Sequence, residues 1–358
     1  MPANSEDIEG MSGAGLPRLS IRLHGGLDAR RCVALAEAAE ANGFHSLWFA
    51  ENPFNRGALP AAAACAMATS RVGIGIGVFN PHNRHPTLMA MEIGALDELA
   101  QGRARLGIGS GIAAATERMG LNPDRPLAAV RDAFAIVRAL LRGEEVTYRG
   151  GLFSADRVRL EFKPFRADIP LLMAARGEQA LVLCGKIADG LLVSNMCPPQ
   201  FTRQAAAAVT EAAHAAGRSP PGDIVQYIPC AVGRDRSEAH RFAKTAIGEM
   251  LPGYWALAQR TATARTALLR AAQLSEADFE QAVARLRAGE RAVDALDNRF
   301  VAAFAIAGTP ADCLAQARHY RVAGVTELAL TFLGAHPEAA MEALAQACEA
   351  PGAITQKA

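Results

Sequence analysis

The densest group of polar side chains in the sequence is the loop N-P-H-N-R-H-P, residues 80–86. It follows Val72 to Phe79, a short apolar run with the composition of a β-strand. His82 and His85 have H-x-x-H spacing, but no neighbouring carboxylate completes a ligand set, so we predict no metal site. We expect the loop to cap the next helix and to line a pocket, with Arg84 and His85 partly structural.

Glu51 and Asn52 follow another strand-like run, Ser46 to Ala50. In a parallel sheet, these two residues and the 80–86 loop lie at the same edge, because the strands end there. Two roles remain open for them. They either face a functional site or form a turn that caps the following helix.

Two strand-like segments are rich in glycine, GIGIG at 73–77 and GIGSG at 107–111. Glycine weakens a strand, so such clusters indicate a bulge, unusual backbone angles or a flat molecule against the chain. Close packing inside a barrel explains them equally well. A dinucleotide fingerprint is disfavoured, because the acidic residue that it requires about 20 residues further on would fall in a helical segment.

Residues 174–179 (AARGEQ) connect a strand-like run to a helical segment. The N–H groups at a helix N-terminus attract phosphate, and Arg176 adds a guanidinium that binds oxyanions through two hydrogen bonds. The alternative is that Arg176 is a solvated loop residue.

These candidate residues depend on an alternation of strand-like runs with helix-length segments, which indicates a parallel sheet. The strand-like runs are 19–24, 46–50, 72–79, 105–109, 169–175, 190–194, 225–232 and 326–332. Eight parallel strands joined by helices predict an α/β fold, the (β/α)8 TIM barrel, with its site at the carboxyl ends of the strands.

Two segments interrupt the alternation. Residues 145–162 turn at a glycine pair, which predicts a short hairpin between the fourth and fifth barrel strands. Residues 237–308 are too long for one crossover helix and contain a capping box at Ser275, so we expect a helical insertion between strands seven and eight that helps to roof the site. The predicted domains are a flexible tail (1–17), the barrel with its insertion (18–348) and a C-terminal tail (349–358).

The composition excludes several function classes. With 37 basic and 36 acidic residues the net charge is +1, and no basic stripe indicates a nucleic-acid or membrane partner. No run approaches the ~20 apolar residues of a membrane helix, and residues 1–17 lack the features of a secretion signal. The seven cysteines form no C-x-x-C pair, which is typical of reduced thiols in a cytoplasmic protein. The G-x-S-x-G, P-loop and H-E-x-x-H motifs are absent from the sequence, which disfavours hydrolases, nucleoside triphosphatases and metalloproteases.

Five segments, taken in order, resemble the luciferase-like oxidoreductase superfamily, and within it the deazaflavin-dependent 5,10-methylenetetrahydromethanopterin reductase branch. They are GFHSLWFAEN (43–52), GIGVFNPHNRHP (75–86), LDELAQGRARLGIGSG (96–111), ARGEQ with ADGLLVS (175–179 and 188–194), and AIAGTPADC (305–313). The resemblance implies a TIM barrel that binds coenzyme F420, a 5-deazaflavin, or alternatively FMN.

The resemblance also implies roles for individual residues. The acidic catalytic position after the second strand falls on Glu51, and a histidine that donates a proton in some members is replaced by Asn52. Asparagine cannot act as a general acid near neutral pH. A non-prolyl cis peptide that supports the ring falls between Gly77 and Val78. The implied cofactor contacts are Gly77, Val78, Asn80, Ser110, Gly111, Arg176, Gly177, Gln179 and Ser194.

The expected function is hydride transfer between F420 and a small organic substrate. Ile112 stands where some deazaflavin-dependent sugar-phosphate dehydrogenases carry a carboxylate, which argues against that activity. One alternative is an FMN-dependent monooxygenase that incorporates molecular oxygen, and another is a cofactor-free barrel scaffold. We also expect a homodimer that pairs through the helices near Met67, Met89 and Met91.

Overall fold

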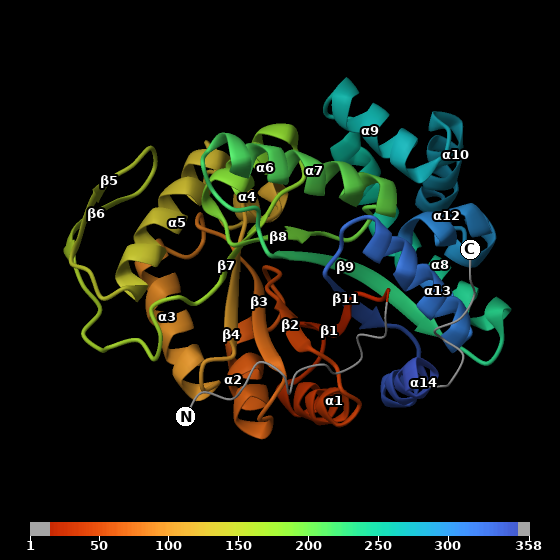
Figure 1. Cartoon of the computed structure of the whole chain (residues 1–358). Coiled ribbons are helices and arrows are strands. Elements are labelled where there is room, and N and C mark those ends of the chain that lie inside the picture. The colour runs from red at the N-terminus through yellow and green to blue at the C-terminus, as the bar shows by residue number, and fades with distance from the viewer. Residues whose placement is uncertain (1–14, 350–358) are drawn as a thin grey trace.

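The structure is a computed structural model that describes residues 15–349. Eight parallel strands form a closed ring in the order β1-β2-β3-β4-β7-β8-β9-β11, with β11 pairing again with β1 (Figure 1). The predicted TIM barrel is therefore confirmed. The strands are Arg18–His24 (β1), Ser46–Ala50 (β2), Gly73–Phe79 (β3), Ala104–Ile108 (β4), Leu171–Ala174 (β7), Gly190–Val193 (β8), Asp223–Val232 (β9) and Glu327–Phe332 (β11).

Helices cover the outside of the ring (Figure 1). The principal ones are Ala29–Ala41 (α1), Ala58–Ala68 (α2), Pro86–Leu99 (α3), Pro126–Leu141 (α5), Glu178–Ile187 (α6), Pro199–Ala215 (α7), Pro310–Val322 (α13) and Pro337–Glu349 (α14). Local residues set where several begin. The Asp28 side chain accepts from Arg31 N at the start of α1, and Pro86 occupies the first turn of α3, where a missing N–H costs nothing.

The two predicted interruptions are present. The hairpin of β5 (Val146–Arg149) and β6 (Ser154–Val158) lies apart from the barrel, at the left of Figure 1. The insertion contains Arg236–Ala258 (α8), Ala262–Ala272 (α9), Glu276–Arg287 (α10), Ala292–Ala295 (α11) and Asn298–Phe304 (α12). Its core is separate from that of the barrel, and the predicted capping box at Ser275 begins α10.

Two short elements were not predicted. β10 (Ile306–Gly308) pairs with the end of β9, beyond the residues of β9 that pair with β8. α4 (Ala113–Arg118) follows the glycine-rich segment 107–111. Both are at most six residues long, and periodicity cannot identify elements of that length.

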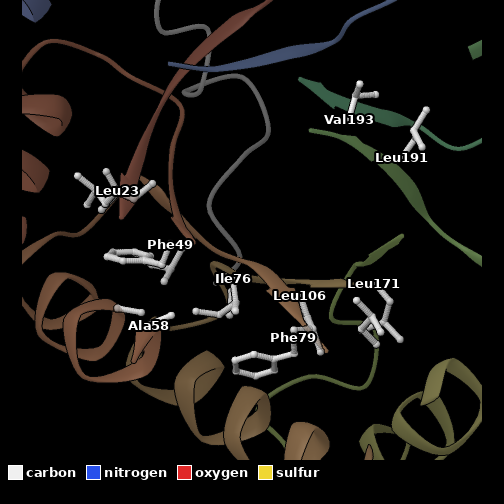
Figure 2. Close-up of a cluster of buried hydrophobic side chains, with 14 of the residues drawn as sticks. Leu23, Phe49, Ala58, Ile76, Phe79, Leu106, Leu171, Leu191 and Val193 are labelled. Atoms are coloured by element: carbon white, nitrogen blue, oxygen red, sulfur yellow. The ribbon is translucent and has the colours of Figure 1, made fainter. Parts of the chain in front are cut away.

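The barrel strands have two shells of side chains. Figure 2 shows part of the outer shell, in which Leu23, Phe49, Ile76, Leu106 and Leu171 come from successive strands of the ring. The inner shell is a separate cluster of Trp48, Leu172, Leu192, Val225, Tyr227 and Ala329. Because neighbouring residues of a strand point to opposite faces, each strand contributes to both shells.

The inner shell explains part of the glycine pattern. A Cβ on Gly75 would lie 2.5 Å from the Trp48 ring, and one on Gly107 would lie 3.1 Å from Leu192. At these positions glycine makes room for large inward side chains, as the packing interpretation predicts.

The predicted tails fall largely outside the described residues, namely at positions 1–14 and 350–358. Leu16, placed in the N-terminal tail, is only 6% exposed and packs in the main core. Within residues 15–349, no helix combines the length and the apolar character needed to cross a membrane.

Candidate active site

The loops after β3 and β4 are fastened together by Asn80. Its Nδ2 donates to Thr116 Oγ1 of α4 at 3.1 Å, and its Oδ1 accepts from His82 N at 3.0 Å. Gly111 has a φ of +65°, and a Cβ there would lie 2.7 Å from Asn80 Nδ2. Two predicted cofactor contacts, Asn80 and Gly111, are thus brought together. The Asn80 amide is hydrogen-bonded to Thr116 and to the backbone of His82.

The backbone of β3 is irregular at its carboxyl end. The Gly77–Val78 peptide is cis, as the resemblance predicted, and the register with β4 shifts between Gly77 and Phe79. Tyr227 lies against this point, since a Cβ on Gly77 would be only 1.7 Å from Tyr227 Oη. Only glycine fits at position 77 while Tyr227 keeps this position.

Glu51 is held by two partners. Its Oε1 accepts from Arg84 Nη2 at 2.6 Å, and its Oε2 accepts from the N–H of Ala58 at 3.1 Å. Ala58 is the first residue of α2, so the helix-capping role is confirmed. Arg84 also pairs with Glu92 of α3, and its guanidinium carbon lies 4.2 Å from the Phe79 ring centroid. This network joins the carboxyl ends of β2 and β3, while Asn52 lies half-buried next to Glu51.

Both histidines of the 80–86 loop make contacts with the backbone of neighbouring segments. His85 is the N-cap of α3, where its Nδ1 accepts from Thr87 N at 3.3 Å, and its ring packs edge-to-face on Phe153. His82 Nε2 lies 3.0 Å from the carbonyl oxygen of Asp124. The prediction that this loop caps α3 is therefore confirmed.

The end of β7 presents Arg176 and the start of α6. Arg176 Nη2 donates to Met196 O at 3.1 Å, whereas Nη1 is shielded from solvent and has no hydrogen-bond partner in the part of the chain that the structure describes. The guanidinium carbon lies 4.9 Å from the centroid of the Tyr254 ring, on α8. Gly177 is the N-cap of α6, and a Cβ there would meet nothing within 4 Å. A cation with a free donor therefore adjoins an open helix N-terminus.

The other predicted contacts lie at the same ends of the strands. Ser110 is half-buried and follows β4, Gln179 is exposed in the first turn of α6, and Ser194 is half-buried after β8. The neighbour of Ser194, Asn195, has a shielded Oδ1 that is unpartnered within residues 15–349.

Sequence analysis missed two polar residues inside the barrel, Arg22 and Tyr227. Arg22 Nε and Tyr227 Oη are shielded from solvent and find no hydrogen-bond partner among the described residues. The guanidinium carbon of Arg22 lies 5.0 Å from the Tyr227 ring centroid. A signal was present for Arg22, because polar residues alternate with apolar ones along β1, and Arg18, Ser20 and Arg22 share the face that meets the barrel interior.

The opposite, amino-terminal end of the barrel interior carries a closed network around Glu327. Its carboxylate is fully buried and accepts from Trp48 Nε1 at 2.7 Å, from both terminal nitrogens of Arg105 at 2.8 and 3.0 Å, and from Ser20 Oγ at 2.7 Å. Burial alone would raise the pKa of Glu327, but the Arg105 guanidinium and these hydrogen bonds hold it well below its usual range.

The chain is similar to known proteins over most of its length. Residues 14–327 match the family model described as luciferase-like monooxygenase. The chain is 30% identical over 294 residues to the 5,10-methylenetetrahydromethanopterin reductase of Methanolobus tindarius, covering 82% of this chain and 87% of that protein. It is 34% identical over 178 residues to the F420-dependent glucose-6-phosphate dehydrogenase of Beutenbergia cavernae, covering 46% and 53% of the two chains.

A solved structure shows the same architecture. The coenzyme F420 dependent tetrahydromethanopterin reductase from Methanopyrus kandleri superposes with a TM-score of 0.82 at 26% identity, covering 92% of this chain and 98% of that one.

Proposed function

Because the chain belongs to the luciferase-like monooxygenase family and is an oxidoreductase, we propose that it transfers a hydride between coenzyme F420 and a small organic substrate. Its similarity to F420-dependent enzymes favours F420, since one relative is an F420-dependent dehydrogenase and one similar solved structure is an F420-dependent reductase. The reaction is of the methylenetetrahydromethanopterin reductase type, in which the deazaflavin, when bound, supplies the hydride chemistry.

The observation that carries this proposal is the free donor of Arg176 beside the open start of α6. A shielded guanidinium nitrogen without a partner is costly unless an anion completes it. Helix N-termini and arginine both favour phosphate, and F420 and FMN each carry a phosphate group. Arg176, Gly177 and Gln179 therefore hold the phosphate end, and Ser194 lies next to it.

The ring end of the cofactor contacts the tips of β3 and β4. The residues assigned to it are Gly77, Val78, Asn80, Ser110 and Gly111. Among them, Asn80 links the two loops through its amide and Gly77 lies against Tyr227, which supports a backbone that is in place before the ring binds.

Glu51 and Asn52 face the reacting end in this proposal, with different tasks. Glu51 is anchored by Arg84 and by the start of α2, so it orients the ring edge through a fixed carboxylate. Asn52 donates or accepts a hydrogen bond but holds no transferable proton near neutral pH. Ile112, 65% exposed, offers no carboxylate for a sugar-phosphate substrate.

Cofactor titration tests the assignment. We expect the purified full chain to bind F420 at least tenfold more tightly than FMN, with the bound compound identified by mass spectrometry. Arg176→Met should weaken F420 binding by at least tenfold, because the phosphate loses its cation. The control is Arg157→Met, which removes a 77% exposed arginine from the hairpin. Tighter binding of FMN would overturn the F420 assignment in favour of a monooxygenase, and binding of neither would favour a cofactor-free scaffold.

The proposal also includes a cytoplasmic homodimer. The seven cysteines are all free thiols, which suits a reducing compartment. Met67 (70% exposed), Leu88 and Met91 offer an apolar face on α2 and α3. Met89, which we expected on that face, is instead fully buried against the barrel, because it points to the opposite side of α3. Light scattering of Met67→Glu/Met91→Glu, expected to be monomeric, tests this face.

A further inference from the structure

Arg22 is a cation in the barrel interior that has no anionic partner among the described residues. It lies on β1, two residues before the carboxyl end of the strand. Its Nη1 donates to the neutral Thr331 Oγ1 across a long 3.5 Å contact, and its Nε is shielded and unpartnered. Within residues 15–349, no carboxylate lies at ion-pair distance from it.

Two other arginines of the barrel, Arg105 and Arg103, are satisfied. Arg105, in the layer below, pairs with both oxygens of Glu327. Arg103 has no carboxylate, but it donates to backbone carbonyls, among them Val72 O at 2.6 Å and Ala66 O at 2.9 Å. The deficit at Arg22 is therefore a local feature of the carboxyl-terminal layer.

The surroundings of Arg22 are aromatic and suited to an anion. The Tyr227 ring adjoins its guanidinium, and the hydroxyl of Tyr227 is itself an unused donor or acceptor. Burial lowers the pKa of Arg22, while Tyr227 and Tyr254 oppose that change. Tyr254 also contacts Arg176, so the two incompletely partnered guanidinium groups share one aromatic neighbour.

We propose that Arg22 binds an oxyanion group of the substrate, and that this group is the carboxylate of a small organic acid. The planar guanidinium fork matches two carboxylate oxygens, and one cation balances one negative charge. Tyr227 Oη, lacking a partner among the described residues, supplies a third donor. This inference rests on the proposed function, in which the cofactor phosphate occupies Arg176 and leaves Arg22 for the substrate.

The body of this acid is apolar. Exposed apolar side chains follow the ends of β2 and β4, with Phe54 60% and Ile112 65% exposed. The guanidinium carbon of Arg118, on α4, lies 4.5 Å from the Phe54 ring centroid. Benzoate and its neutral isostere benzamide are therefore matched probes, and phenyl phosphate is the probe for a phosphate ester.

Calorimetric titration of the full chain, with and without F420, tests the site. We expect benzoate to bind at least tenfold more tightly than benzamide, and Arg22→Met to abolish this preference. Arg22→Lys, which keeps the charge, should retain part of it, and Arg157→Met should retain all of it. Circular dichroism and the affinity for F420, expected within threefold of the wild type, show that Arg22→Met is folded.

Equal binding of benzoate and benzamide by the wild type, or an unchanged preference in Arg22→Met, would overturn the inference. Tighter binding of phenyl phosphate than of benzoate, lost in Arg22→Met, would keep the oxyanion site but assign it to a phosphate ester. The two proposals fail separately. An anion preference without F420 binding removes the cofactor assignment alone, whereas F420 binding without an anion preference removes the role of Arg22 alone.

Discussion

The two ends of the barrel interior contain similar residue types but differ in how their polar atoms are satisfied. At the amino ends of the strands, Glu327, Arg105 and Trp48 form a closed network. At the carboxyl ends, Arg22 and Tyr227 each keep a shielded polar atom without a partner among the described residues. A satisfied buried network stabilises a fold, while an incomplete one costs stability until a ligand completes it. The comparison separates a structural layer from a binding layer.

The largest expected effect comes from opening the closed network. Glu327→Gln removes the nearer of the two carboxylates that pair with Arg105, the other being Asp223 at 3.5 Å, and breaking a buried ion pair costs about 3–5 kcal/mol of unfolding free energy. Urea denaturation at neutral pH measures this loss. As a control, Glu145→Gln breaks the exposed pair with Arg157 and should cost no more than about 1 kcal/mol. A loss below about 1 kcal/mol for Glu327→Gln would remove the distinction between the layers.

The closed network also makes stability depend on pH. Burial lowers the pKa of His45 to about 4, although Glu327 lies 3.9 Å away, because Arg105 and Arg18 add to the effect of burial. Between pH 6.5 and 4 the unfolded chain binds the proton and the folded chain does not, so stability falls as the pH falls through this window. The contribution is at most about 3 kcal/mol.

Denaturation profiles of the wild type and His45→Gln measure this dependence. The unfolding free energy of the wild type minus that of the variant should fall from pH 7 to pH 4, because only the wild type carries the titrating group. His214→Gln, at an exposed helical position, is the matched control. Parallel profiles for the wild type and His45→Gln would show that His45 does not titrate in this window.

Two substitutions of aromatic residues compare how much a polar atom contributes to stability in the structural layer and in the binding layer. Trp48→Phe removes the donor to Glu327 and should cost about 2 kcal/mol, since hydrogen bonds to charged groups contribute about 1.5–3 kcal/mol. Tyr227→Phe removes a hydroxyl that has no partner within residues 15–349 and should change stability by less than about 0.5 kcal/mol. Thermal unfolding under identical conditions gives both values. Equal losses for the two variants would contradict the comparison.

A small effect is also expected for Arg22→Met on the ligand-free protein. Because no carboxylate is left uncompensated, unfolding free energy should stay within about 1 kcal/mol of the wild type or increase. Chemical denaturation without added anions measures it. A loss of more than about 2 kcal/mol would show that Arg22 belongs to the structural layer.

Much of the fold was predictable from local patterns. Short apolar runs rich in strand-forming residues located all eight barrel strands, and the capping box at Ser275 marked a helix start, because these signals depend on residues close in sequence. The pattern of β1 also shows which of its residues share a face. The short elements α4 and β10 carried too few residues for a periodic signal.

The site was predictable only in part. The strand-end positions of Glu51, Asn80 and Arg176 follow from strand order, but the pairing of Glu51 with Arg84 and the start of α2 required the folded loops. The sequence left the helix-capping role of Glu51 as one of two alternatives, and the free donor of Arg176 became visible only with its neighbours in place.

The sequence by itself therefore determined the eight barrel strands, the long helices and, along β1, which side chains share a face. Only the tertiary structure decided which polar atoms are paired. Glu327 and Arg105 are separated by 222 residues in the sequence, and Arg22 and Thr331 by 309 residues. Their contacts therefore exist only once the ring of strands is closed. Closure fixes which inward side chains share a layer, and that depends on the pairing of all eight strands rather than on any single segment.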